Sequence, residues 1–262
     1  MKLFDTHVHL GDAQFAGDRA EVLERAALKG VGTVVEIADS PDDWEAALAL
    51  SRARPQQVRC SLGLHPYYAD RFSEELLVAL EAKVKLPEVV AVGEIGLDYV
   101  KAQAPKAVQL AAFERLLSAC RGWDKPVVVH CRGAYEDLVP LLRKVYPAPP
   151  EDHRFWGVVH CFSGTPEEAL ACAALGFALG ADGPVTYPKN EPLRQAFLGA
   201  GLGVTVLETD CPYLPPQSSR GKRNEPSAVL EIAQRLAQVF GVGIDEVARR
   251  TTENARALYR LP

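Results

Sequence analysis

Two histidines stand one residue apart near the N-terminus, His7 and His9 in the segment DTHVHL. The apolar residues before them are typical of a β-strand, on which side chains two positions apart point to the same side. Both imidazoles can therefore contact one metal ion. A His-x-His pair alone is a weak signal, so the prediction depends on polar residues that come later in the chain.

Four more polar residues lie at the ends of strand-like runs: Glu94, His130, His160 and Asp210. Imidazoles and carboxylates are the ligands that borderline divalent metals use in hydrolytic sites. We predict that all six residues bind metal. Glu208, two residues before Asp210 on the same face, is interpreted as a supporting or core polar residue, because Asp210 lies nearer the end of the strand.

Other polar residues at these strand ends have weaker assignments. His65 can donate to a substrate oxygen, although a histidine that is merely hydrogen-bonded in a loop explains it equally well. Arg132 directly follows the His130 run and is predicted to bind an anionic substrate. A basic segment is either a second anion site or a solvated loop; it contains Arg220, Lys222 and Arg223. The cysteines that follow the proposed ligands (Cys131, Cys161 and Cys211) are interpreted as packing residues, and His153 is given no role.

Short β-type runs alternate with helical stretches along the whole chain. The runs predicted as strands are 3–8, 31–38, 58–64, 89–95, 127–131, 156–161, 177–180 and 204–208. Several are continuously apolar, which is typical of strands covered on both faces. Helix starts are predicted at Ser40, Ser73 and Thr165, and a last short helix at Thr251.

Eight strand–helix units predict an α/β protein with parallel strands joined by right-handed crossovers. An open, doubly wound sheet is disfavoured because the first turn lacks a phosphate-binding glycine set. The candidate ligands also come from the first, fourth, fifth, sixth and eighth strands, whose ends meet only in a closed ring. We therefore predict one (β/α)₈ TIM barrel over residues 1–262, with the metal site at the C-terminal ends of the strands.

Composition limits the function classes. The chain has 262 residues and a net charge of −5, which argues against sequence-independent coating of nucleic acid but allows local binding through metal ions. No Cys-x-x-Cys pair is present, so reduced thiols are expected. Acids and histidines interrupt the N-terminal segment and no apolar run approaches a membrane span, so we expect a cytoplasmic protein without a membrane partner. No obligate protein partner is evident.

Taken together, the motifs resemble the TatD family of metal-dependent hydrolases, within the wider amidohydrolase group. The resemblance runs nearly from end to end and rests on segments 5–10, 63–67, 93–99, 126–132, 160–164, 183–187, 208–214 and 220–226. Two positions depart from the family pattern. Leu116 stands where a second glutamine is expected after Gln109 and Phe113, and residues 121–124 lack the usual leucine. Both departures lie on the helical layer, so they concern packing.

The resemblance implies a binuclear site and hydrolysis of phosphodiesters, typically as a deoxyribonuclease of the 3′-5′ exonuclease type. By position, His7, His9, Glu94 and Asp210 would hold one metal, and Glu94, His130 and His160 the other. The ligand types suit Zn, Mn, Co or Ni, whereas Mg alone suits so many nitrogens less well.

The corresponding hypothesis is attack on phosphorus by a metal-activated water, whose proton Asp210 accepts while His65 and Arg132 position the phosphate. DNA or another phosphodiester is then the expected partner. The main alternative is an enzyme that uses the same constellation on amides or esters, such as a cyclic-amide hydrolase or an aminoacyl-tRNA deacylase. Two others are a binding module that uses the metals as a clamp and an interaction protein that merely retains the fold.

Overall fold

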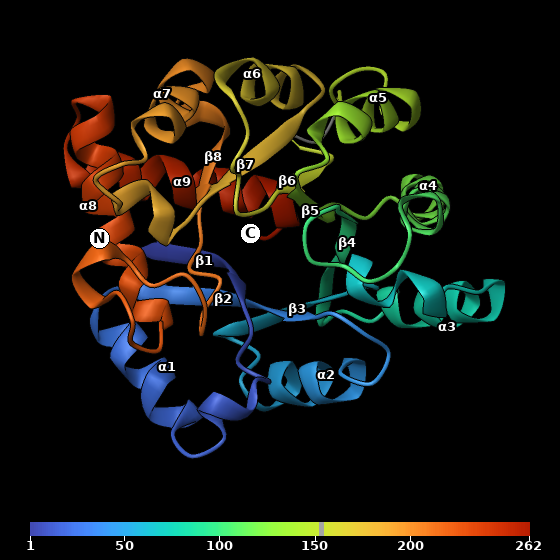
Figure 1. The fold of residues 1–262 in the computed structure, drawn as a ribbon. Helices are drawn as coiled ribbons and strands as arrows, with labels where there is room; N and C mark the ends of the chain where they lie inside the picture. The colour runs from blue at the N-terminus through green and yellow to red at the C-terminus, as the bar shows by residue number, and fades with distance from the viewer. Residues whose placement is uncertain (152–154) are drawn as a thin grey trace.

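Eight parallel strands follow chain order around a barrel, as seen in a computed structural model that describes residues 1–151 and 155–262 (Figure 1). The strands are β1 (Leu3–Val8), β2 (Val31–Ala38), β3 (Val58–Leu62), β4 (Val89–Asp98), β5 (Val127–Arg132), β6 (Gly157–Val159), β7 (Phe177–Ala181) and β8 (Thr205–Leu207). The predicted TIM barrel is confirmed. The prediction for His153 concerns a residue outside the described ranges.

Helices lie outside the barrel between the strands (Figure 1). They are α1 (Arg19–Leu28), α2 (Trp44–Ala53), α3 (Glu74–Val84), α4 (Lys106–Trp123), α5 (Tyr135–Val145), α6 (Pro166–Ala174), α7 (Glu191–Ala200), α8 (Val229–Phe240) and α9 (Ile244–Tyr259). A 3₁₀ segment, η2 (Pro66–Arg71), follows β3 and brings two tyrosines to the rim of the barrel.

Two of the predicted helix starts are confirmed by their caps. Thr165 and Glu168 form a reciprocal capping box at α6, and Ser73 accepts from the Leu76 amide at α3. The prediction at Ser40 is wrong: α2 begins at Trp44, and the Ser40 hydroxyl donates to Asp43 instead. The prediction at Thr251 is also wrong, because α9 begins at Ile244 and Thr251 is a buried position within it.

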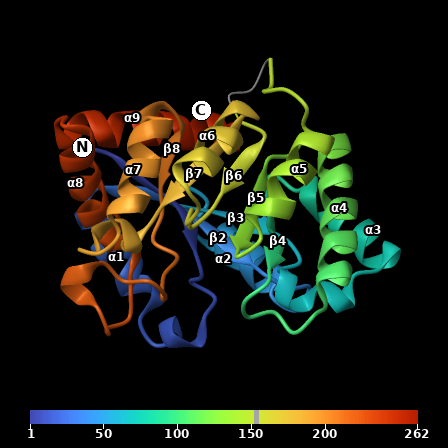
Figure 2. The same cartoon turned by 45° about the horizontal axis from the view of Figure 1, so that its top comes forward.

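Apolar side chains form two cores, one on each face of the sheet. The outer core packs the strands against α1 to α8 and the beginning of α9. The inner core fills the barrel with Phe4, Val35, Val128 and Val206, and α9 adds Leu258 and its neighbours to it. Helix α9 therefore covers the end of the barrel where the strands begin, beside both chain termini (Figure 2). This leaves the opposite end free for polar side chains.

The barrel closes between β1 and β8 through a short seam. The Asp210 amide donates to the His7 carbonyl at 3.0 Å, and the His9 amide donates to the Cys211 carbonyl at 2.8 Å. Two residues before His7, the Asp5 carboxylate takes the place of a backbone carbonyl as acceptor. It accepts hydrogen bonds from the amide and the hydroxyl of Thr209. The seam thus sets the relative positions of three predicted metal ligands. Among the described residues, no helix combines the length and apolarity needed to cross a membrane.

Candidate metal centre

A cavity of about 540 Å³ opens at the C-terminal ends of the strands. Residues from most strand ends line it: His9, Asp39, His65, Tyr67, Tyr68, Glu94, Lys101, His130, Arg132, His160, Cys161, Asp210, Tyr213 and Leu214. The predicted site residues are the six proposed ligands, His65 and Arg132, and seven of these eight line the cavity. The remaining one, His7, is fully buried next to Glu94. All eight predicted site residues therefore meet at one rim of the barrel.

Glu94 lies at the centre of this group, on β4, with 2% of its surface exposed. Glycines on both sides let β4 pass close to β5. A Cβ atom on Gly93 would come within 2.6 Å of Val128, and one on Gly96, where φ is +152°, within 2.0 Å of the His130 carbonyl. Only glycine fits both positions.

The two oxygens of Glu94 face different partners. Oε1 lies 2.6 Å from His130 Nδ1 and 2.7 Å from His160 Nε2, and these two nitrogens are 3.4 Å apart. Oε2 instead lies 3.4 Å from His7 Nε2. One carboxylate therefore joins two separate clusters of donor atoms.

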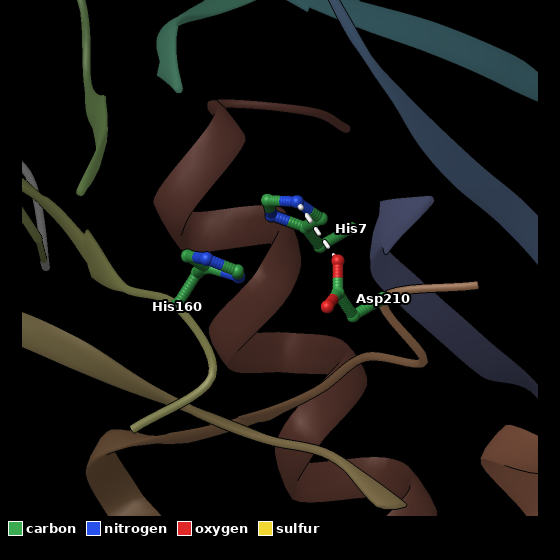
Figure 3. A group of neighbouring side chains, drawn as sticks. All are labelled: His7, His160 and Asp210. Carbon is green, nitrogen blue, oxygen red and sulfur yellow. Dashed lines mark ion pairs between the residues drawn. The ribbon is translucent and has the colours of Figure 1, made fainter. Parts of the chain in front are cut away.

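The second cluster comes from the seam between β1 and β8. His7 Nε2 and His9 Nε2 are 3.2 Å apart, and the Oδ1 atom of Asp210 lies 3.6 Å from the first and 3.3 Å from the second. Figure 3 shows the Asp210 carboxylate pointing toward His7, with the His160 ring beside it. The His7 and His160 rings stack with centroids 3.9 Å apart, so the two clusters are in contact.

The donor set fits divalent metals. Four imidazoles and two carboxylates bring lone pairs together, and neither lysine nor arginine is among these six residues. Facing ring nitrogens at 3.2–3.4 Å must share a proton or a cation. Three overlapping groups have donor atoms within 4.8 Å of one another: His7 with His160 and Asp210, His7 with His9 and Glu94, and His65 with Glu94 and His130.

The electrostatic field also attracts cations. Burial lowers the pKa of His9, but the negative charges of Asp39, Asp210 and Glu94 outweigh it and raise that pKa to about 10. Burial would raise the pKa of Glu94, yet the surrounding imidazoles His160, His130 and His65 hold it well below its usual range. Asp210 behaves likewise, since its bond to His9 overcomes burial and lowers its pKa. Both carboxylates thus stay ionised.

Further carboxylates orient the imidazoles from behind. Asp98 Oδ2 lies 3.1 Å from His130 Nε2, which leaves Nδ1 free to face the cavity. Glu208 Oε1 lies 3.6 Å from His160 Nδ1, and Asp39 Oδ2 lies 3.9 Å from His9 Nδ1. We anticipated a supporting role for Glu208 but not for Asp39 or Asp98. The criterion that selected Asp210, an acidic residue at the end of a strand, would also have selected Asp39 and Asp98.

His65 differs from the other histidines. Its Nδ1 accepts from the Tyr67 amide at 3.1 Å, and its Nε2 lies 3.7 Å from Glu94 Oε1. Burial lowers the pKa of His65 to about 3, so the ring is neutral. A neutral ring that accepts at Nδ1 carries its proton on Nε2, so His65 presents a donor to the cavity.

Arg132 lies at the rim, where its Nη1 donates to Asp98 at 3.3 Å and to the Tyr67 hydroxyl at 3.4 Å. Asp98 therefore contacts both the inner histidine and the rim arginine. The basic segment does not reach the cavity. Arg223 pairs with Asp18 and Glu225, Arg220 stacks on Tyr187, and Lys222 is exposed.

The departures from the family pattern fall in packing positions. Leu116 is buried in the outer core. Gln109 accepts from the Asp98 amide at 2.8 Å and donates to the Asp98 carbonyl at 3.0 Å, so the retained glutamine holds the end of β4. Cys131 and Cys211 are buried, whereas Cys161 lines the cavity and donates to Asp182.

Comparison with known proteins agrees with this geometry. A family profile described as "TatD related DNase" matches residues 4–260. An uncharacterized metal-dependent hydrolase of Bacillus subtilis, YabD, is 34% identical over 99% of both chains. The 3′-5′ ssDNA/RNA exonuclease TatD of Erwinia billingiae is also 34% identical, over 99% of this chain and all of that one.

A solved structure extends the similarity to three dimensions. The crystal structure of YjjV, a TatD homologue from Escherichia coli K12, superposes with a TM-score of 0.91 at 30% identity, covering 99% of this chain and 98% of that one. The protein is therefore a member of the TatD-related DNase family of metal-dependent hydrolases.

Proposed function

We propose that this protein is a two-metal phosphodiesterase that degrades DNA from one end, as a 3′-5′ exonuclease. Its metal sites would be His7, His9, Glu94 and Asp210 on one side, and Glu94, His130 and His160 on the other. Divalent metals bound there would supply a water of lowered pKa and stabilise charge on the phosphoryl oxygens. Zn, Mn, Co and Ni match the donors better than Mg alone.

One observation carries the proposal: the two oxygens of Glu94 face two different nitrogen clusters, at 2.6–2.7 Å on one side and 3.4 Å on the other. A carboxylate in this position can bridge two cations. Paired metals are typical of enzymes that displace groups at phosphorus, including nucleases and phosphatases.

The chain's own residues divide the remaining work. Asp210 stays ionised within 3.3–3.6 Å of two ligand nitrogens and would accept the proton of the attacking water. His65 would donate from Nε2 to a phosphoryl oxygen. Arg132, with about a third of its side chain exposed, would bind the same phosphate from the rim.

The cavity lining supports a nucleic acid substrate over a small amide. Lys101 and Arg132 give it cationic side chains inside an acidic protein. Tyr67, Tyr68 and Tyr213 are each more than a third exposed at its rim, where bases can stack on them. The relative from Erwinia billingiae that is named an exonuclease matches over the whole chain.

The test is to strip the protein with a chelator, restore single metals, and supply end-labelled single- and double-stranded DNA beside amide and ester substrates. We expect a product ladder that shortens from the 3′ end and depends on the restored metal. Turnover of the acyl substrates alone would replace this proposal with the amide or ester hydrolase alternative.

Variants assign the roles. Asp210→Asn should lower turnover at least 100-fold while much of the metal remains bound. Arg132→Gln should raise KM more than it lowers kcat, because it removes a phosphate contact. Arg115→Gln is the matched control for Arg132, since Arg115 pairs with Glu74 on the outer helices. Full turnover by Asp210→Asn with both metals bound would rule out Asp210 as the base.

A further inference from the structure

A second cavity of about 350 Å³ adjoins the metal cavity on the side of β1 and β2. We call it the side cavity. Four residues line both spaces: His9, Asp39, Tyr68 and Tyr213. A ligand held at the metal centre can therefore extend past His9 into the side cavity. Its volume lies in the range of about 300–1,000 Å³ that is typical of small-molecule sites.

Charge divides the two cavities. Among the described residues, the lysine and arginine side chains that line them, Lys101 and Arg132, both belong to the metal cavity. Apart from His9, the titratable groups that line the side cavity are all carboxylic acids: Asp12, Glu36, Asp39 and Asp43. Burial raises the pKa of Glu36 and of Asp39 to about 7, so these two are partly charged at neutral pH. A phosphate is attracted to the first space and repelled by the second.

Two tyrosines form the boundary between the cavities. Tyr213 donates its hydroxyl to Asp12 at 2.9 Å and packs edge-on against His9, with ring centroids 5.8 Å apart. Tyr68, on η2, also lines both cavities. Aromatic rings at a cavity entrance can stack on a nucleobase, and such stacking tolerates any of the four bases.

Some of the carboxylate oxygens already have partners and others do not. Both oxygens of Glu36 accept from backbone amides, those of Leu10 and Gly11. Asp39 Oδ1, in contrast, is shielded from solvent and has no hydrogen-bond partner in the part of the chain that the structure describes. About a third of the Asp39 side chain is exposed, and its other oxygen, Oδ2, lies 3.9 Å from His9 Nδ1. When ionised, Oδ2 can accept from an N–H group of a nucleobase.

We propose that the side cavity binds the base of the terminal nucleotide, the one that is released, and that its carboxylates prevent a further phosphate from entering. This inference rests on the proposed nuclease function and adds a reason for cleavage at an end. The scissile phosphate lies at the metal centre, the remaining strand follows Lys101 and Arg132, and the terminal base passes between Tyr68 and Tyr213. Beyond the base, Asp12 and Asp43 repel a further phosphate.

Binding of a product tests the base site without any turnover. For the Zn²⁺-loaded protein, calorimetry should show deoxyadenosine 5′-monophosphate binding about tenfold tighter than 2-deoxyribose 5-phosphate, which lacks the base. Tyr68→Ala should bring the two affinities close together. Arg115→Gln, which changes a side chain that pairs with Glu74 on the outer helices, should leave their ratio unchanged. Equal affinities in the unaltered protein would overturn the proposal.

Cleavage tests the exclusion of phosphate. Single-stranded DNA with a 3′-hydroxyl end should be cut at least tenfold faster than the same strand with a 3′-phosphate. The double variant Asp12→Asn with Asp43→Asn should reduce this preference, while its melting temperature reports that it is folded. An unchanged preference would overturn the exclusion. Absence of all DNA cleavage, with the base still bound preferentially, would instead refute the nuclease function and leave the base site standing.

Discussion

The two sides of Glu94 differ in how their histidines are held. On the Oε1 side, Asp98 lies 3.1 Å behind His130 and Glu208 lies 3.6 Å behind His160. On the Oε2 side, Asp39 is 3.9 Å from His9, and among the described residues no carboxylate pairs with His7 Nδ1. Within those residues, neither His7 Nδ1 nor His160 Nδ1 has a hydrogen bond, so the difference lies in how near the carboxylates are. Carboxylates behind ligating histidines set ring orientation and raise basicity. The Oε1 side is therefore the better organised of the two.

The difference has a structural origin. The Oε1 side is built on β4, β5 and β6, which are neighbours in both chain and sheet. The Oε2 side is built on the seam between β1 and β8, where the ladder is short and Asp5 substitutes for part of it. We expect metal to bind more tightly on the Oε1 side, and four experiments can break or sharpen this comparison.

The largest effect is expected for Glu94→Gln, which removes the group common to both sides. An amide has one acceptor oxygen and cannot bridge two cations as a carboxylate can. Metal content should fall below two ions per chain, and turnover should fall by more than the roughly 10- to 100-fold typical of outer-sphere substitutions. Mass spectrometry measures the metal content, and DNA cleavage measures the turnover. Glu88→Gln, a surface glutamate paired with Arg52, is the control.

Single histidine deletions should then separate the two sides. His9→Ala should leave one metal ion tightly bound at the Oε1 side, whereas His130→Ala should abolish the tighter phase of a metal titration. Competition with a chromogenic chelator resolves the two phases. If His9→Ala instead removed the tighter phase, the order of the two sides would be reversed.

Substitution of the supporting acids should have a smaller effect. Asp98→Asn should weaken metal binding about 10- to 100-fold, because it contacts His130 directly. Asp39→Asn should weaken it only a few-fold, since Asp39 lies 3.9 Å from His9. If both variants lost the same metal affinity in the chelator competition, the distance between carboxylate and imidazole would not determine how much the carboxylate strengthens metal binding.

The last effect concerns stability and pH and leaves metal binding aside. Asp182, which accepts from Cys161 behind the Oε1 side, has its pKa raised to about 8, mainly by burial and then by the charge of Glu208. Its pKa is far lower when the chain is unfolded. Between about pH 4 and pH 8 the folded protein thus keeps a proton that the unfolded chain loses, and the free energy of unfolding falls as pH rises.

Asp182→Asn removes this dependence. For the metal-free protein, the variant should gain stability relative to the parent as pH rises from 5 to 8, by up to about 1.4 kcal/mol for each pH unit. Melting temperatures in the presence of chelator measure the gain, which should reach several degrees. Asp70→Asn, at an exposed position, should show no such trend. If the variant gained the same stability at pH 5 and at pH 8, the raised pKa of Asp182 in the folded protein would be wrong.

Much of the fold follows from local pattern. The continuous apolar runs and the polar residue at the end of each predict parallel strands whose C-terminal ends share one rim, and the six predicted ligands do meet there. Two strand ends differ from the prediction: β4 continues to Asp98, and β6 stops at Val159, one residue before His160. The carboxylate Asp98 was missed as a partner because the predicted strand ended at residue 95.

The sequence by itself determined the barrel and the set of chemically useful residues, because strand periodicity and residue type are local properties. Tertiary structure alone decided which oxygen of Glu94 faces which histidine, that α9 covers the opposite end of the barrel, and that a side cavity adjoins the metal centre. These features depend on strand register and on a seam between residues some 200 positions apart in the chain. No local pattern encodes such contacts.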